Sequence, residues 1–250
     1  MMISKLLQHD QHFLNNINVV KASIKAAELN KNDTVLEIGP GKGILTTELA
    51  KKCKEVVAIE IDESLKAELA KMPKNVEILY GNALKLINEV HFNKIVANIP
   101  YSITEPLFGK LLKLEFEAAV LLIGQNFYEL LNGKEKWGII SKLFFEVDKV
   151  MDVPKDNFEP RPRTDSVLVK ITPRKKLLSE KEKIMKELIL QDDKKLKNAL
   201  MFAQMRIRNI TKNQAREEME KIKLAQEWWD KRVMHLSGVQ FEMVVKEIVG

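Results

Sequence analysis

The chain has 250 residues and a net charge of +6, with 45% hydrophobic and 30% charged residues. This composition is typical of a folded protein in water, and no apolar run approaches the roughly 18 residues of a membrane span. A single cysteine, Cys53, rules out an internal disulfide, and the histidines are not spaced as zinc ligands. We therefore expect a metal-free cytoplasmic protein without a secretory signal or membrane segment, containing one typical domain and a smaller one.

Short β-branched runs alternate with helical patterns along the first two thirds of the chain. Strands are predicted at Thr34–Ile38, Val56–Ile61, Val76–Tyr80, Lys94–Ala97, Ala118–Ile123 and Val167–Ile171. Thr46–Lys54 and Glu63–Lys71 carry apolar residues at helical spacing. This alternation predicts an α/β fold, with a Rossmann-like parallel sheet covered by helices on both faces.

The strand signals stop after Pro173. Three helix starts with capping-box spacing follow, at Ser179 with Glu182, Thr211 with Gln214, and Ser237 with Gln240. They predict a small all-helical C-terminal domain, so that the chain divides into domains 1–175 and 176–250. Residues 174–223 include 15 basic and 8 acidic side chains, an excess larger than the net charge of the whole chain. Such a segment is either a solvated helical surface or a face that binds a polyanion.

A glycine-rich turn follows the first predicted strand, where residues 37–43 read EIGPGKG. Gly39 and Gly41 allow the backbone to turn tightly and to approach a ligand at the C-terminal edge of the sheet. Glu60 ends the next strand, where a carboxylate can accept hydrogen bonds from ribose hydroxyls. Each feature alone could be an ordinary turn or a solvated acid. Together they favour a site for a nucleoside cofactor.

The residues Asn98, Ile99, Pro100 and Tyr101 follow another predicted strand and should face the same crevice. Although such a sequence could be a simple turn, it also meets a chemical need. The exocyclic amine of adenine is a poor nucleophile because its lone pair is delocalised into the ring. The Asn98 side-chain oxygen and the Ile99 carbonyl could each accept one amino proton, which would aim the lone pair at a sulfonium methyl. Pro100 would fix the turn, and Tyr101 would stack on a flipped-out base.

These motifs closely resemble those of the ribosomal RNA adenine dimethyltransferase family, and the resemblance covers nearly the whole chain. Residues 11–14 are similar to the family's N-terminal cofactor motif, 37–43 to its glycine loop, 59–62 to its ribose-binding motif, 81–84 to its adenine-binding motif, 98–101 to its catalytic motif, and 158–162 with Ser166 to its F-x-P-x-P loop. The resemblance implies a Rossmann-like methyltransferase domain that uses S-adenosyl-L-methionine, followed by a helical domain that binds RNA or the ribosome.

The resemblance also implies which residues form the site. The cofactor would be bound by His12, Leu14, Gly39, Gly41, Glu60, Asn82 and Asn98, and catalysis would depend on Asn98, Ile99, Pro100, Tyr101 and Phe158. Tyr101 and Phe158 would sandwich the target base. Leu14 could equally be ordinary core, whereas Phe158 is expected outside the core because its loop is rich in proline.

Three positions depart from the family pattern. Asn82 stands where aspartate is usual, so its bond to the cofactor's adenine would lack the strengthening effect of a charge. Phe127 replaces a usual glutamate and Ile139 a usual arginine. If those two residues normally form an ion pair, losing both together leaves no unpaired charge and can be nearly neutral.

The implied function is dimethylation of adenines near the 3′ end of small-subunit ribosomal RNA during ribosome biogenesis. The expected partner is this RNA or a pre-ribosomal particle, and the protein is expected to be a monomer. Two alternatives stay open: a large-subunit methyltransferase of the antibiotic-resistance type, and a non-catalytic RNA-binding assembly factor. The C-terminal residues 231–237 favour the small subunit, and the presence of Glu60 and Asn98 argues for catalysis. A DNA adenine methyltransferase is disfavoured because no target-recognition domain is evident.

Overall fold

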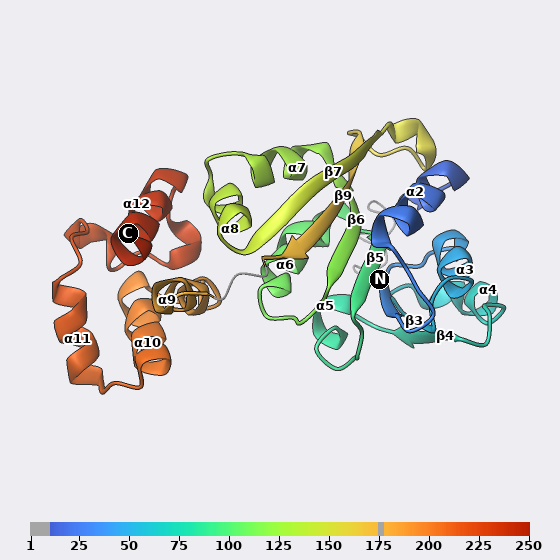
Figure 1. The fold of residues 1–250 in the computed structure, drawn as a ribbon. Coiled ribbons are helices and arrows are strands. Elements are labelled where there is room, and N and C mark those ends of the chain that lie inside the picture. Colours follow the sequence, from blue (N-terminus) through green and yellow to red (C-terminus); the bar gives the residue numbers. More distant parts are fainter. Residues whose placement is uncertain (1–10, 175–177) are drawn as a thin grey trace. The chain divides into compact units, whose positions relative to one another are not determined.

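The computed structural model describes residues 11–174 and 178–250. The chain divides into two compact units (Figure 1). One comprises the chain up to Glu129 together with Phe145–Pro173, and the other comprises Leu130–Phe144 together with Arg174–Gly250. The predicted boundary between positions 175 and 176 lies outside the described residues. No helix within the described ranges is both long and apolar enough to cross a membrane.

The first unit is built on a seven-stranded sheet with the order β4-β3-β2-β5-β6-β9-β7. Its strands are β2 (Thr34–Ile38), β3 (Glu55–Glu60), β4 (Val76–Tyr80), β5 (Lys94–Asn98), β6 (Ala118–Gly124), β7 (Phe145–Val153) and β9 (Ser166–Pro173). The five strands from β4 to β6 are parallel, whereas β9 runs antiparallel to both of its neighbours, β6 and β7. The predicted Rossmann-like α/β class is confirmed, with an antiparallel edge added to the parallel sheet.

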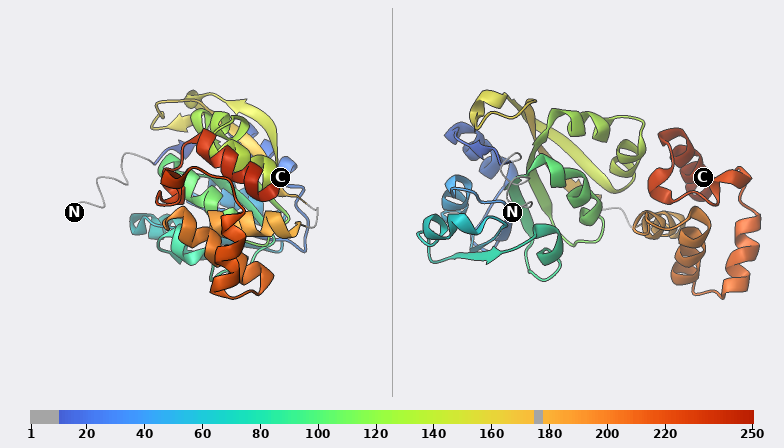
Figure 2. Two further views of the ribbon diagram at one scale, coloured as in Figure 1. Left: turned by 90° about the vertical axis from the view of Figure 1, so that its left-hand side faces the viewer. Right: turned by 180° about the vertical axis from the view of Figure 1, so that it is seen from behind.

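Helices cover both faces of this sheet (Figures 1 and 2). Buried residues run without a break along most of β2 and β6, which is possible only if both faces are covered. The helices of the unit are α2 (Ile17–Ala27), α3 (Ile44–Ala50), α4 (Lys66–Leu69), α5 (Ala83–Leu86), α6 (Tyr101–Leu111) and α7 (Gln125–Asn132, which runs past the end of the unit), with 3-10 turns η1 (Glu63–Leu65) and η2 (Lys155–Asn157). Of these, α2 packs against α3, and α5 packs against α6.

The strand order reverses between β2 and β5. Strand β2 pairs with β3 on one side and with β5 on the other, both in parallel. In open α/β sheets a ligand binds beyond the carboxyl ends of the strands at such a switch point. A small second sheet joins β1 (Phe13–Leu14) to β8 (Phe158–Glu159), with Leu14 opposite Phe158. This pairing brings together two motifs from nearly opposite ends of the first unit's sequence.

The second unit is helical in its described part. It contains α8 (Lys136–Phe144), α9 (Glu180–Ile189), α10 (Leu196–Arg208), α11 (Lys212–Glu220) and α12 (Gly238–Val249), with 3-10 turns η3 (Gln226–Trp228) and η4 (Val233–His235). All three predicted capping boxes are present, at Ser179, Thr211 and Ser237, so these three helix starts are confirmed. Buried residues on α9, α10 and α12, such as Leu188, form the core of the unit.

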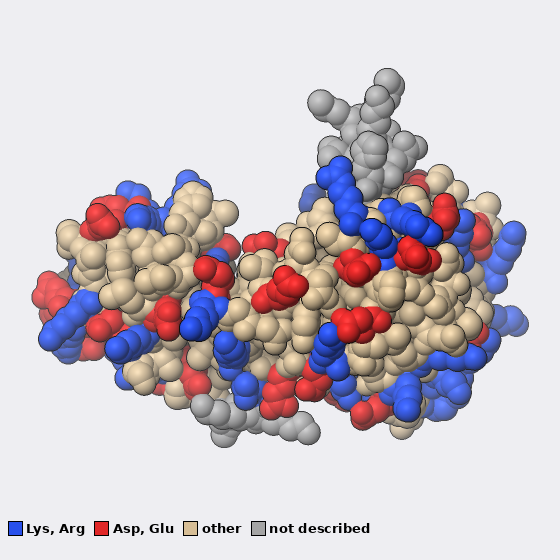
Figure 3. Space-filling model, turned by 90° about the horizontal axis from the view of Figure 1, so that it is seen from above, with Lys and Arg blue, Asp and Glu red and all other residues tan. Residues whose placement is uncertain are grey.

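Many basic side chains of the helical unit are paired with acidic ones. Lys195 and Lys197 both donate to Asp230, at 3.0 and 2.7 Å. Arg208 contacts Glu180 and Glu218. On the face that Figure 3 shows, blue basic and red acidic side chains are interspersed. The excess of positive charge in this part of the sequence is therefore partly neutralised locally.

Candidate active site

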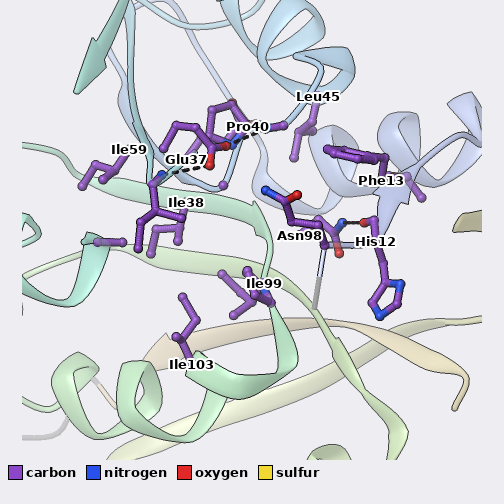
Figure 4. A pocket seen from close by; sticks show the side chains of 18 of the residues that line it. His12, Phe13, Glu37, Ile38, Pro40, Leu45, Ile59, Asn98, Ile99 and Ile103 are labelled. Carbon is purple, nitrogen blue, oxygen red and sulfur yellow. Dashed lines mark hydrogen bonds between the residues drawn. The ribbon is translucent and has the colours of Figure 1, made fainter. Parts of the chain in front are cut away.

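A cavity of about 740 Å³ lies at the carboxyl ends of β2 to β5 (Figure 4). This volume is typical of a site for a small molecule or cofactor. All the residues predicted for the site line it: His12, Leu14, Gly39, Gly41, Glu60, Asn82, Asn98, Ile99, Pro100, Tyr101 and Phe158. They share an apolar wall that was not predicted from the sequence, which includes Ile38, Leu45, Ile59 and Ile103. Ile38 and Ile59 lie within the glycine-loop and ribose-binding motifs but were given no role of their own, and Leu45 and Ile103 lie outside every predicted motif.

The glycine loop adopts a backbone conformation that other residues rarely take. Gly39 and Gly41 have φ angles of +69° and +55°. A β-carbon at Gly41 would lie 2.8 Å from an atom of the Phe13 ring. The Gly39 amide donates to the Ile59 carbonyl at 2.9 Å, which ties the loop to the end of β3. The loop therefore reaches over the strand ends only because these positions are glycine.

Glu60 is a buried carboxylate that organises the loops around the cavity. Oε2 accepts a hydrogen bond from the Gly41 amide at 3.1 Å, and Oε1 accepts from the amides of Ile61 and Asp62 at 2.8 and 2.9 Å. A carboxylate offers about four acceptor positions. Three are occupied by backbone amides, so Oε2 keeps one position for a ligand hydroxyl.

Glu37 is a second buried carboxyl group in the cavity wall, and no role was predicted for it from the sequence. Its Oε2 has no hydrogen-bond partner among the described residues. Burial raises the pKa of Glu37 to about 8, with the nearby Glu60 carboxylate adding to the rise and the Thr46 hydroxyl opposing it. At neutral pH this raised pKa favours the protonated form of Glu37. A cationic ligand in the cavity would favour its ionised form.

Asn98 ends β5 with its amide held in a defined orientation. Its Nδ2 donates to the His12 carbonyl at 2.9 Å (Figure 4), and this bond assigns the two ends of the amide. The Oδ1 atom is consequently the end that can accept a hydrogen bond from a ligand. The next amide, that of Ile99, donates to the Leu122 carbonyl of β6 at 3.1 Å. Pro100 then caps α6, so the whole motif is anchored to the sheet.

The His12 side chain lies beside Tyr101. Its ring centroid is 5.9 Å from that of Tyr101, with the planes tilted by 40°. His12 Nδ1 lies 2.7 Å from the Pro160 carbonyl. Because a carbonyl only accepts, Nδ1 carries the proton of this bond. Figure 4 shows the ring turned away from Glu37 and Pro40. The backbone of His12, rather than its imidazole, faces Asn98.

Phe158 is buried, contrary to the expectation that it stands outside the core. Its side chain is 2% exposed and belongs to the same apolar cluster as Leu14. The physical reason is the pairing of β1 with β8, which draws the proline-rich loop onto the N-terminal motif. Both residues also line the cavity. Contact between Phe158 and a target base stays a prediction.

Asn82 caps the short helix α5 at the rim of the cavity. Its Oδ1 accepts a hydrogen bond from the Leu84 amide at 2.9 Å. An amide oxygen has a second lone pair, so it could still accept from a ligand. No group of His, Cys, Asp or Glu side chains suited to a metal ion occurs within the described ranges.

Residues 4–232 match the family model described as ribosomal RNA adenine dimethylase. The chain belongs to this family. It is 35% identical over 254 residues to "Probable ribosomal RNA small subunit methyltransferase A" of Methanococcus maripaludis, covering 93% of this chain and 96% of that protein. It is 45% identical over 172 residues to the protein of the same name from Methanococcus aeolicus, covering 65% of this chain and 64% of that one.

The fold has a counterpart among solved structures. A dimethyladenosine transferase from Plasmodium falciparum matches with a TM-score of 0.63 and 27% identity, covering 93% of this chain and 96% of that one. The predicted family and the predicted enzyme class, an RNA methyltransferase, are confirmed.

Proposed function

We propose that this protein transfers methyl groups from S-adenosyl-L-methionine to the exocyclic amine of adenines in small-subunit ribosomal RNA. The observation that carries the proposal is the orientation of Asn98. Its donor end is bonded to the His12 carbonyl, so its acceptor end is available at the cavity. A target amine that is positioned through its N–H groups needs a hydrogen-bond acceptor at this cavity.

The residues of the cavity fit S-adenosyl-L-methionine. The glycine loop allows a ligand atom to come close to the protein backbone at Gly39 and Gly41. Glu60 Oε2 can accept a hydrogen bond from one ribose hydroxyl. The unpartnered oxygen of Glu37 suits a ligand that carries positive charge. Asn82 would accept from the adenine amino group. The cofactor, when bound, supplies an electrophilic methyl group on a positively charged sulfur.

The chain's own groups would then prepare the target amine. Asn98 Oδ1 and the Ile99 carbonyl accept hydrogen bonds from its two N–H groups and hold the nitrogen in a geometry that exposes its lone pair. Tyr101 stacks on the extruded base, an interaction worth roughly 1–3 kcal/mol, comparable to the cost of unstacking. The amine becomes acidic once methylated, so its proton can leave to water without a strong general base.

The choice of the small subunit is supported by the names of the relatives. Both archaeal proteins are named as small-subunit methyltransferases, and the Plasmodium protein as a dimethyladenosine transferase. We propose ribosomal RNA or a pre-ribosomal particle in the cytoplasm as the partner, and contact with RNA through the helical domain at 176–250.

The test is to incubate the protein with labelled S-adenosyl-L-methionine and unmodified small or large ribosomal subunits, and then to map the labelled nucleotide. We expect label on adenines near the 3′ end of the small-subunit RNA, and labelling that is slower by about 10²–10³-fold with the Asn98→Ala variant. Label on the large subunit would indicate the resistance-type activity. Binding without transfer would indicate an assembly factor. Either result would overturn the proposal.

A further inference from the structure

Tyr101 is held at the far end of its side chain by a buried serine. Its hydroxyl lies 2.6 Å from Oγ of Ser166, although 65 residues separate the two in sequence. Ser166 begins β9, and its relative exposure is 0%. A buried hydroxyl costs free energy unless it is hydrogen-bonded. The bond to Tyr101 is the side-chain hydrogen bond that satisfies Ser166.

The strand pair that carries Ser166 also supports the ring of Tyr101. Gly124 on β6 is the cross-strand partner of Ser166. A β-carbon built at Gly124 would lie 3.6–3.7 Å from three atoms of the Tyr101 ring, so the ring lies against this part of the backbone. The His12 ring lies nearby, and Tyr101 also lines the cavity. The end of the β6–β9 pair is therefore a support for a ring that borders the site.

The backbone alone does not determine the direction of this ring. Tyr101 is the first residue of α6, directly after Pro100, so its backbone is restrained, but the backbone does not set the side-chain torsions. The hydrogen bond at the phenol end adds to the packing of the ring, because it holds the side-chain atom farthest from the backbone.

We propose that Ser166 is a positioning residue for methyl transfer, whose hydroxyl holds the Tyr101 ring in the orientation that stacks on the target adenine. This inference rests on the proposed function, since it takes Tyr101 as the platform for the base. Small displacements of a bound reactant reduce the rate strongly. Loss of the hydroxyl pair should therefore affect the transfer step and RNA engagement, and leave cofactor binding unchanged.

The test is a double-mutant cycle with Ser166→Ala and Tyr101→Phe, each of which removes one partner of the same hydrogen bond. We expect each single variant to lower the single-turnover rate about 3- to 10-fold, the effect of one neutral hydrogen bond. The double variant should be no slower than either single variant, because Ser166 acts only through the Tyr101 hydroxyl. Affinity for S-adenosyl-L-methionine, measured by calorimetry, should be the same in all four proteins.

Ser23→Ala is the matched control, because the Ser23 hydroxyl is also buried and bonded, at 2.9 Å to the Val19 carbonyl within α2. It should leave the rate unchanged. Equal losses from Ser166→Ala in the wild-type and Tyr101→Phe backgrounds would show a merely structural role and overturn the inference. An unchanged rate would do the same. Should Ser166→Ala fail to fold, Tyr101→Phe still removes the bond and must show the loss.

Tyr101→Ala separates this inference from the proposed function. If it retains the wild-type rate, the stacking role itself fails. If it abolishes transfer while Ser166→Ala and Tyr101→Phe are as fast as wild type, only the positioning role of Ser166 fails.

Discussion

Replacing Glu37 by glutamine should change how the stability of the protein depends on pH. Glu37 is fully buried at the end of β2, and burial raises its pKa from the ordinary 4.5 to about 8. In the unfolded chain the same carboxyl group ionises near its ordinary pKa. Between these two values the folded state keeps a proton that the unfolded state has lost.

The sign follows from this difference in bound protons. As the pH rises from 4.5 to about 8, ionisation stabilises only the unfolded state, so the free energy of unfolding falls. The full pKa difference corresponds to at most about 5 kcal/mol. Above pH 8 both states are ionised and the contribution becomes constant. Below pH 4.5 both are protonated and it vanishes.

Glu37→Gln removes this titration while keeping the shape of the side chain. We expect the variant to gain stability relative to wild type progressively from pH 5 to pH 8, by several kcal/mol within the limit of about 5. Urea denaturation at intervals across this range measures the difference. Glu77→Gln, which changes an exposed residue of β4, is the control for net charge. Parallel pH profiles for wild type and Glu37→Gln would refute the reasoning.

The other predictions concern the cofactor, the chemistry and the RNA. Glu60→Ala should weaken S-adenosyl-L-methionine binding by roughly 1.5–3 kcal/mol, and unchanged affinity in calorimetry would discard the role of Glu60. Asn98→Ala should lower the single-turnover rate by about 10²–10³ with RNA binding intact, and a variant keeping more than about a tenth of the rate would contradict the mechanism. If Lys195 and Lys197 contact phosphates, Lys197→Gln should reduce the slope of the logarithm of the RNA-binding constant against the logarithm of the salt concentration by up to roughly 0.7–0.9. Asp230→Asn removes the acidic partner of both lysines and should strengthen RNA binding. An unaltered slope in a salt series would mean that these lysines are only surface charge.

Features that depend on neighbouring residues were predictable from the sequence. The β-branched runs predicted six strands of the sheet. The glycine loop and Glu60 lie at the carboxyl ends of two adjacent parallel strands, which meet at one edge of the sheet. The capping boxes, such as that of Ser179 with Glu182, involve residues three positions apart and were predicted correctly. The strand β7 was not predicted, because as an antiparallel edge strand it exposes much of its length and lacks a buried apolar run.

Contacts between distant segments were not predictable from local sequence patterns and became visible in the folded chain. Pairing of Leu14 with Phe158 buried a ring that its loop sequence had suggested would be accessible. The orientation of Asn98 depends on a carbonyl 86 residues away, and that of Tyr101 on a hydroxyl 65 residues away. The raised pKa of Glu37 depends on the burial that the surrounding strands and helices create. Local sequence patterns encode backbone conformation and the buried face of each element, whereas these properties arise only when separate elements pack and exclude water.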